Sequence, residues 1–290
     1  MATTVQSTFE DKFADVDGMS IRYIEDGSGP AVLLFHGASL GSSADVYRRT
    51  IGPLAAEGFR VIAFDFPGFG LSEYSEDGSI GIKKKTTLGL MDALGIDKAA
   101  LVGHSQAGNV AVQLGLENPE RVSHVVILGC GSLLPPLEGG AGKREEAVLQ
   151  RMDKRMAQTE PTIEDTRKLL EANLFHHELI TDEELELRHS RSVGRNFEAF
   201  VARNEARAKA QAAGKGGGGG TPLWQRLTEL KMPLLMIYGR EDRARAADRF
   251  ALLKEKEPDL NMHLAEGCKH LVPWDAADLF QEVVPPFLKN

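Results

Sequence analysis

Short apolar runs recur along the chain and alternate with longer stretches in which apolar residues follow helical spacing. An apolar run without polar interruption is typical of a strand buried on both faces of a parallel sheet. The alternation therefore predicts an α/β fold with a doubly wound, mostly parallel sheet, and two shorter strands near the N-terminus predict a small antiparallel start. We expect strands at 9–16, 19–25, 31–35, 60–64, 99–102, 123–128, 233–238 and 261–265, and helices at 44–57, 82–94, 108–116, 246–255 and 274–288.

The alternation stops between 133 and 230, where the chain is charged, helical in spacing and free of buried-strand runs. We predict an α/β core formed by 1–132 and 231–290, interrupted by a helical cap over the strand ends, where ligands bind in such sheets. The cap ends in a polyglycine loop at 214–220, a composition that resists order. Its helices are expected near 143–158, 163–172, 182–192 and 197–213.

Composition excludes several classes of protein. The 290 residues carry a formal net charge of −8, which gives no support for a nucleic-acid partner. The first residues lack the basic and apolar parts of a signal peptide, and no apolar run is long enough to span a membrane. We therefore expect a cytoplasmic protein without a membrane partner, and the sequence leaves a homodimer open. The two cysteines, Cys130 and Cys268, form neither a disulfide framework nor a metal-binding spacing, so no metal and no cofactor are expected.

The stretch 99–116 combines an apolar run, a sharp turn and a helical segment, with Ser105 at the apex. Gly103 and Ala107 flank this serine in the small-x-Ser-x-small pattern of a nucleophile elbow, with Ala107 in place of the second glycine. Larger side chains there would collide with the neighbouring strand or helix. The pattern predicts a serine nucleophile above a helix N-terminus that favours a developing negative charge. The alternative is an ordinary turn with a surface serine.

A serine nucleophile needs a base, and the base needs an orienting acid. Asp242 lies just past the strand at 233–238, and His270 lies just past the strand at 261–265. The order Ser105, Asp242, His270 is the order expected of an α/β-hydrolase triad. These positions at strand ends predict that the three side chains meet.

Asp242 and His270 each have a simpler explanation than membership of a triad. Glu241 competes with Asp242 for the histidine, but adjacent residues point in different directions and only one can serve. Asp242 could instead pair with Arg240 or Arg243, and His270 could be an ordinary residue at a helix N-terminus. Each alternative is plausible for one residue alone. The occurrence of Ser105, Asp242 and His270 in the expected order along the chain favours the triad.

An oxyanion hole is expected from backbone amides, namely that of Gln106, after the nucleophile, and that of Ala38, after His36-Gly37. Gly37 allows the close approach that the site needs, and His36 is expected to support this loop by packing. The alternative is simple loop geometry.

Together these residues resemble the α/β-hydrolase superfamily over nearly the whole chain outside the cap. They are most similar to the branch of the meta-cleavage-product hydrolases, which cleave a carbon–carbon bond in ring-fission products of aromatic degradation. The resemblance implies the α/β-hydrolase fold and a small-molecule substrate. It rests on the pieces FHGAS, FDFPGFGLS, GHSQAG, YGREDR and KHLVPWDAADLF.

Within the cap, ITDEELELRH is similar to the segment of that branch that carries an arginine for the substrate carboxylate. The resemblance implies that Arg188 has this role, although a surface pairing with Glu184 would explain it equally well. Other expected substrate-binding residues are Gly37, Ser39, His104, Leu271 and Trp274.

The chain departs from the branch at three places. The branch usually has asparagine before the nucleophile and tryptophan directly after the catalytic histidine, where this chain has His104 and Leu271, with Trp274 further on. The glycine-rich oxyanion loop is replaced by Ala-Ser-Leu-Gly-Ser at 38–42. These departures leave ester hydrolysis open beside carbon–carbon cleavage.

Four functions follow from these observations. The first expectation is a serine esterase that hydrolyses a small carboxylic ester, such as an acid-bearing monoester, through an acyl-enzyme. The second is carbon–carbon hydrolysis of a vinylogous diketone acid by the same triad. A hydrolase-fold ligand receptor and a cofactor-free oxygenase or lyase are the alternatives from other classes. A serine at 105 argues against haloalkane dehalogenases and epoxide hydrolases, which need a carboxylate there.

Overall fold

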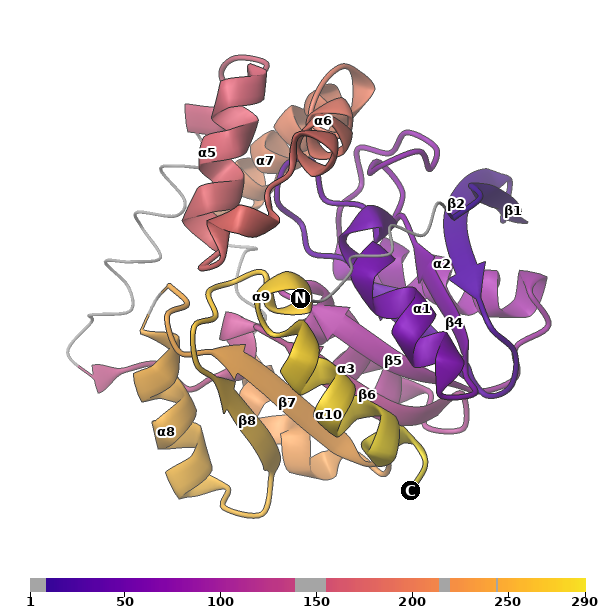
Figure 1. Cartoon of the computed structure of the whole chain (residues 1–290), viewed down its shortest axis with the longest axis vertical. Helices are drawn as coiled ribbons and strands as arrows, with labels where there is room; N and C mark the ends of the chain where they lie inside the picture. Colours follow the sequence, from indigo (N-terminus) through magenta and orange to yellow (C-terminus); the bar gives the residue numbers. More distant parts are fainter. Residues whose placement is uncertain (1–8, 139–154, 214–219, 244) are drawn as a thin grey trace.

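The computed structural model describes residues 9–138, 155–213, 220–243 and 245–290. Within these residues, one eight-stranded sheet crosses the molecule in the order β1-β2-β4-β3-β5-β6-β7-β8 (Figure 1). The β1–β2 and β2–β4 pairs are antiparallel and all other pairs are parallel, which confirms the predicted sheet. The strands are β1 (Lys12–Val16), β2 (Met19–Asp26), β3 (Ala31–Phe35), β4 (Arg60–Phe64), β5 (Ala99–His104), β6 (Val122–Leu128), β7 (Leu234–Gly239) and β8 (Asn261–Ala265).

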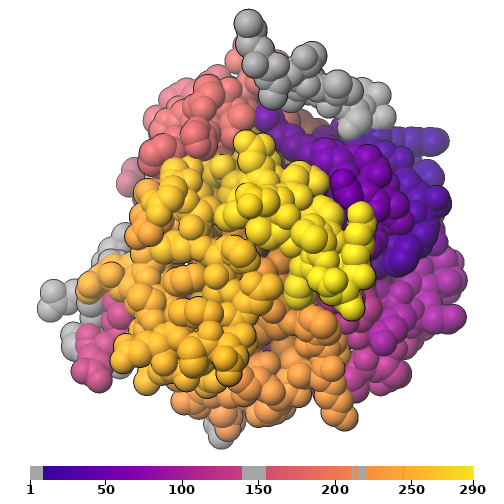
Figure 2. Space-filling view, turned by 60° about the horizontal axis from the view of Figure 1, so that its bottom comes forward, coloured from indigo at the N-terminus to yellow at the C-terminus, as the bar shows by residue number. Residues whose placement is uncertain are grey.

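Helices cover both faces of the sheet, and the side chains of each central strand alternate between two cores. In β3, Leu33 and Phe35 belong to one buried cluster, whereas Val32 and Leu34 belong to the other. Figure 2 shows the face on which the yellow C-terminal residues lie beside the violet N-terminal part of the chain. One core is covered by α1 (Arg48–Ala56), α9 (Val272–Asp275) and α10 (Ala277–Leu288), and the other by α2 (Ile80–Ala93), α3 (Ala107–Glu117) and α8 (Ala246–Lys256).

Two predicted helices are each divided in the structure. The expected helix at 44–57 begins as the 3-10 helix η1 (Ala44–Tyr47), capped by the Ser43 side chain, and continues as α1. The expected helix at 274–288 is interrupted at Ala276, whose φ of −116° and ψ of 33° lie outside the helical region. The interruption separates the short α9, directly after His270, from the longer α10.

The part of the chain between β6 and β7, called here the inserted segment, contains helices joined by turns and loops, and no strand among its described residues. Helices α5, α6 and α7 lie beyond one end of the sheet (Figure 1). The segment's last helix, η5, instead packs against α3, and its Leu227 belongs to the core. Cap borders at 133 and 230 stay a prediction, and most of 143–158 and of the glycine loop at 214–220 lies outside the described residues. The helices are η2 (Gly131–Leu133), α5 (Ile163–Asn173), η4 (His177–Leu179), α6 (Asp182–Ser190), α7 (Arg195–Ala212) and η5 (Leu223–Glu229).

Local sequence explains why α5 and α6 form and lie together. Thr162 and Asp165 make a reciprocal capping box at the start of α5. Thr181 caps α6 through its side chain, which accepts a hydrogen bond from the Glu184 amide. The hydroxyl of Thr166 on α5 lies 3.0 Å from His189 Nδ1 on α6, so the two helices are tied directly to each other.

Candidate active site

The turn between β5 and α3 is so tight that it requires small residues. Ser105 has a φ of 55°, in the left-handed region that side chains rarely adopt. A Cβ atom added to Gly103 would lie 2.6 Å from the Ala107 carbonyl oxygen, so no larger residue fits there. The Ser105 amide donates to the Leu128 carbonyl at the end of β6, at 2.8 Å. The backbone therefore holds this serine in a strained position that points its hydroxyl off the sheet edge.

The three side chains expected to form a triad lie in hydrogen-bonding sequence. Ser105 Oγ is 2.9 Å from His270 Nε2, and His270 Nδ1 is 2.9 Å from Asp242 Oδ2. The side chains of His270 and Asp242 are largely covered, with 12% and 6% of them exposed. A neutral imidazole that donates from Nδ1 to the carboxylate leaves Nε2 free to accept the serine proton.

The competition between the two adjacent acids is resolved by geometry. Glu241 turns away from the imidazole, and its Oε2 accepts a hydrogen bond from the Cys268 amide at 2.9 Å. Asp242 Oδ1 also accepts from the Arg243 amide at 2.7 Å. Burial raises the pKa of Asp242, but His270 and Arg243 outweigh burial and hold this pKa below its usual range. Asp242 is therefore a carboxylate at neutral pH.

His104 supports the imidazole from behind. Its Nε2 lies 2.8 Å from the His270 carbonyl oxygen, and because a carbonyl only accepts, Nε2 carries the proton. Burial lowers the pKa of His104 to about 3, so this ring stays neutral at physiological pH. Its Nδ1 atom faces Gly37, since a Cβ atom added to that glycine would lie 3.3 Å from it.

The loop after β3 is fixed by His36, which the sequence analysis assigned a packing role. Its Nε2 accepts from the Phe66 amide at 3.0 Å, so the proton is on Nδ1, which donates to the Gly37 carbonyl at 2.6 Å. In a trans peptide the carbonyl and the next N–H point in opposite directions, so the Ala38 N–H turns away from His36. In the part of the chain that the structure describes, neither the Ala38 nor the Gln106 amide donates to another protein group. Both amides are thus available to an oxyanion.

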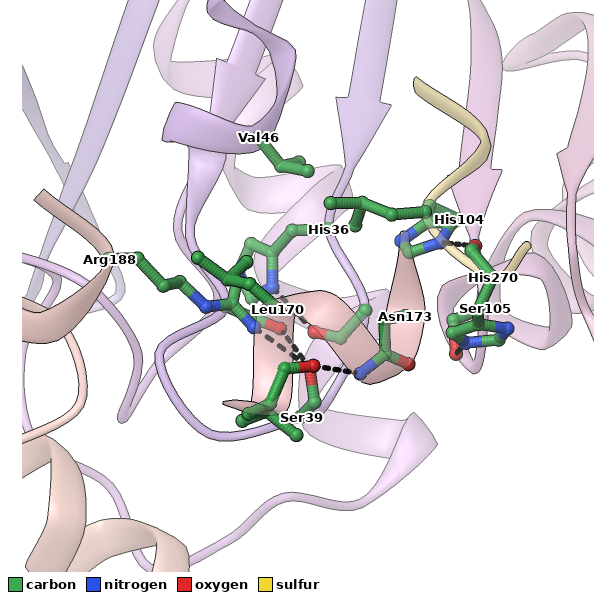
Figure 3. Close-up of a pocket in the computed structure, with 13 residues that line it drawn as sticks. His36, Ser39, Val46, His104, Ser105, Leu170, Asn173, Arg188 and His270 are labelled. Carbon is green, nitrogen blue, oxygen red and sulfur yellow. Dashed lines mark hydrogen bonds between the residues drawn. The ribbon is translucent and has the colours of Figure 1, made fainter. Parts of the chain in front are cut away.

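A pocket of about 400 Å³ opens in front of Ser105. One wall comes from the loops at the strand ends, and the other comes from α5 and α6 of the inserted segment. Arg188 lies on one side of this pocket, and Ser105, His104 and His270 lie on the other (Figure 3). The lining residues are His36, Gly37, Ser39, Ser42, Val46, His104, Ser105, Leu169, Leu170, Asn173, Arg188, His270 and Leu271.

Arg188 is not held on the surface by the acidic residues at the start of its helix. Glu184 pairs with Arg49 at 3.5 Å, and Asp182 pairs with Arg167 at 3.4 Å. Arg188 reaches inward instead, where its Nη2 donates to Ser39 Oγ at 3.0 Å and to the Leu40 carbonyl at 2.8 Å.

Within the described residues Arg188 has no carboxylate within ion-pair distance, and its buried Nε atom has no hydrogen-bond partner. Burial lowers the pKa of this guanidinium to about 10, which leaves it charged at neutral pH. A buried, unpaired cation of this kind is costly unless an anion meets it. The arrangement can therefore bind a carboxylate in the pocket that Ser105 faces.

The expected substrate-binding residues fall into two groups. Gly37, Ser39, His104, Arg188 and Leu271 all line the pocket in front of Ser105.

Trp274 lines a neighbouring cavity of about 310 Å³ that shares Arg188 and Leu271 with the first. Its Nε1 donates to the Val46 carbonyl at 2.9 Å, so the indole supports the pocket wall from the side away from Ser105.

Several lining residues were not predicted. Leu169 and Leu170 are apolar residues of the helix expected near 163–172, which was a usable signal. Asn173, at the end of α5, and Val46, in η1, carry no sequence signal for a pocket. Their positions depend on how the inserted segment packs on the core.

Among the described residues, no group of three or more histidine, cysteine, aspartate or glutamate residues is arranged to hold a metal ion. No helix in the described part of the chain is long and apolar enough to cross a membrane.

The fold and the site together define a class of enzyme. The profile of the family described as "alpha/beta hydrolase fold" matches residues 30–277, so the chain belongs to the α/β-hydrolase family. Its relatives are enzymes, and the chain is an α/β-fold hydrolase.

More particular likenesses lie within that family. The 2-hydroxy-6-oxo-6-phenylhexa-2,4-dienoate hydrolase of Burkholderia cepacia is 33% identical over 297 residues, covering 99% of each chain. A 2-hydroxy-6-oxononadienedioate/2-hydroxy-6-oxononatrienedioate hydrolase of Comamonas testosteroni is 32% identical, covering 91% of this chain and 89% of that one. The solved structure of a meta-cleavage product hydrolase from Pseudomonas fluorescens IP01 has a TM-score of 0.75 at 28% identity and covers 96% of this chain and 97% of its own. The resemblance stated from the sequence is confirmed.

Proposed function

We propose that this hydrolase cleaves a carbon–carbon bond in an acid-bearing ketone of the kind formed when an aromatic ring is opened. The observation that carries the proposal is the guanidinium of Arg188 across the pocket from Ser105, which pairs with no carboxylate among the described residues and whose buried Nε atom has no hydrogen-bond partner there. A substrate with a carboxylate at one end and a ketone at the other can meet both groups at once. The relatives from Burkholderia cepacia and Comamonas testosteroni are named for such molecules, which are 2-hydroxy-6-oxo acids with conjugated double bonds.

In this proposal Ser105 is the nucleophile and His270 is the general base. His270 Nε2 takes the hydroxyl proton as Ser105 Oγ adds to the ketone carbon, and Asp242 stabilises the imidazolium that forms. The ketone oxygen becomes negative, and the N–H groups of Ala38 and Gln106 stabilise this charge.

The next step breaks the bond between the former ketone carbon and its neighbour. The departing carbon keeps the electron pair, which is favourable only if the pair is delocalised. The 2-hydroxydienoate therefore first moves its hydroxyl proton to C5, the carbon next to the ketone, and becomes a 2-oxo-3-enoate. When the bond breaks, the pair spreads through the remaining double bond to the 2-oxo oxygen, beside the carboxylate that Arg188 holds. That oxygen takes the proton from His270 Nε2, which gives the hydroxydienoate product, and the acyl group stays on Ser105. A water molecule activated by His270 hydrolyses this ester and restores the serine.

The comparisons change the order of the functions expected from sequence. Ester hydrolysis was the first expectation, and the named relatives favour carbon–carbon cleavage instead. The same triad would hydrolyse an ester by the same steps, with an alcohol as the leaving group. The relatives reported are hydrolases, and no observation favours a receptor, an oxygenase or a lyase.

The test compares three substrates on one preparation. These are the yellow 2-hydroxy-6-oxo-6-phenylhexa-2,4-dienoate, a phthalate monoester and a neutral p-nitrophenyl ester. We expect the dienoate to lose its colour fastest and to give benzoate and a five-carbon hydroxydienoate in equal amounts, measured by chromatography. The Ser105→Ala variant is the control, and it should neither bleach the dienoate nor release the two products. Turnover of the esters with no dienoate cleavage would overturn the proposal in favour of an esterase.

A further inference from the structure

The loop that carries His270 is bound to the inserted segment on both sides of the histidine. The Leu271 amide donates to the carbonyl of Asn173, the last residue of α5, at 3.0 Å. The Lys269 ammonium group donates to the Glu171 carbonyl, also on α5, at 3.2 Å. The pink α5 region meets the gold and yellow C-terminal residues on the face shown in Figure 2. The base of the triad therefore sits against the same helix that forms one wall of the pocket.

A single carboxylate joins the loop that carries His270 to the turn that follows α5. Asp275, at the end of α9, accepts three backbone hydrogen bonds. Its Oδ2 accepts from the amides of Lys269 and Phe175, both at 2.9 Å, and its Oδ1 accepts from the His176 amide at 3.0 Å. Lys269 directly precedes His270, whereas Phe175 and His176 belong to the turn that follows α5.

We propose that Asp275 is a positioning residue that couples the seating of the inserted segment to the orientation of His270. This inference rests on the proposed role of His270 as the general base. Charge-assisted hydrogen bonds from three amides to one carboxylate are strong and directional, so Asp275 fixes the turn after α5 relative to the residue before His270. When the turn after α5 moves away, Asp275 loses two of its three hydrogen bonds and is free to shift. The Lys269 amide, which is bound to the same carboxylate, then no longer fixes the position of His270.

The rest of the loop transmits such a change directly to the imidazole. Asp275 belongs to the same short turn as the histidine, because its own amide donates to the Leu271 carbonyl at 3.1 Å. The His270 carbonyl is held by His104 Nε2 on the other side. Among the described residues, the loop is bound to the inserted segment on its α5 side only, so a shift there tilts His270 about a fixed point. A misplacement of about 1 Å in a catalytic group can cost about 100-fold in rate.

The experiment compares Asp275→Asn with Asp165→Asn in the full chain. Both residues are aspartates that accept backbone hydrogen bonds at one end of α5, but Asp165 lies at the end far from His270. An asparagine at 275 keeps one acceptor oxygen and turns an NH₂ group toward the amides. Three measurements are made on each variant: dienoate turnover, the rate of covalent labelling by a fluorophosphonate probe, and backbone hydrogen exchange.

We expect Asp275→Asn to lower kcat and the labelling rate by about 10- to 100-fold, with a smaller change in KM. Asp165→Asn should change both rates less than about twofold, although it lowers the melting temperature. The Leu271 amide is the diagnostic site, because its acceptor is Asn173 and not Asp275. Under the proposal its exchange rate rises in Asp275→Asn together with those of Lys269, Phe175 and His176.

An Asp275→Asn protein with unchanged kcat and an unchanged Leu271 amide would overturn the proposal. If that variant fails to fold, Asp275→Glu keeps both acceptor oxygens and should retain most of the activity, and a glutamate variant as stable as the parent but inactive would contradict a positioning role. The Ser105→Ala protein separates this inference from the proposed function. If the probe still labels Ser105→Ala, Ser105 is not the nucleophile and the proposed function is wrong. If labelling is lost in Ser105→Ala but unchanged in Asp275→Asn, the proposed function stands and only the coupling through Asp275 is wrong.

Discussion

Ser105 and His270 stand at the ends of two strands of one sheet, whereas Arg188 and Leu170 reach the same pocket from helices of the inserted segment. On the sheet side, strand pairing and backbone hydrogen bonds fix each functional residue, as the Ser105 amide on the Leu128 carbonyl illustrates. On the helical side, side chains make most of the contacts with the core.

Arginines supply much of that side-chain contact. Arg191 pairs with Asp45 at 3.1 Å, Arg195 donates to the Ser72 carbonyl at 3.0 Å, and Arg203 donates to the Gly68 carbonyl at 2.8 Å. Such bonds can be exchanged one at a time without disturbing the sheet. The difference predicts that substitutions at these arginines alter substrate preference more than chemistry, except around Asp275, where the two sides are tied together.

The largest expected effect is on the sheet side. Ser105→Ala should lower kcat by about 10⁴-fold or more, because it removes the nucleophile. Binding of the dienoate should persist, since the alanine leaves Arg188 and the pocket walls in place. Stopped-flow spectra of the yellow substrate with excess enzyme would measure both properties. A variant that retains substantial turnover would exclude a serine nucleophile.

Two adjacent acids, Asp242 and Glu241, test whether a single carboxylate on the sheet side orients His270. Asp242→Asn should reduce kcat by about 10³-fold, because the amide no longer stabilises the imidazolium. Glu241→Gln should cost less than about tenfold, since Glu241 only holds the Cys268 amide. Steady-state kinetics of the two variants at several pH values would make the comparison. Equal losses in both variants would show that the assignment of Asp242 as the orienting acid is wrong.

The central test of the helical side is Arg188→Gln. We expect kcat/KM for acid-bearing substrates to fall by about 10- to 100-fold, equivalent to about 1.4–2.8 kcal/mol of transition-state stabilisation. Neutral esters of similar size should be hardly affected, because they lack the carboxylate. The ratio of the two effects in this single variant is the measurement, and equal losses for both substrates would remove Arg188 from substrate binding.

The smallest effect on the kinetics is expected from a residue that joins the inserted segment to the core but does not line the pocket. Arg191→Ala removes one partner of Asp45, which keeps its contacts with Arg22 and Arg48. We expect KM to rise by about two- to fivefold and kcat to change little, because the buried Asp45 keeps two arginine partners and is not left as an uncompensated charge. Initial-rate measurements would check this. A large fall in kcat would mean that the two sides of the pocket are less independent than their contacts suggest.

The sequence predicted the sheet side of the site well for identifiable reasons. Buried strands have a strong apolar signal, and residues just past their ends must meet at one edge of the sheet, which is how Asp242 and His270 were found. Ser105 was found because its turn admits only small neighbours. The choice of Asp242 over Glu241 agrees with the hydrogen bonds that the structure gives each acid.

The helical side was harder to predict because it depends on tertiary packing. Nothing in the local sequence around Asn173 or Val46 indicates that they line a pocket, and Trp274 lies one layer further out than expected. The break at Ala276, which places Asp275 at the end of a short helix, was missed because the apolar pattern continues through it.

Arg188 also has a consequence for how ligands can be found. Among the described residues the buried Nε atom of Arg188 has no hydrogen-bond partner, and a buried polar group without a partner costs stability. Under the proposed function a small carboxylate that binds beside Arg188 offsets that cost, and ligand at 100 times its Kd stabilises a protein by about 2.7 kcal/mol. The melting temperature of the Ser105→Ala protein should therefore rise with acids that bind there. A screen of unreactive carboxylates by thermal shift would rank them by their fit to the pocket, before any turnover assay is available.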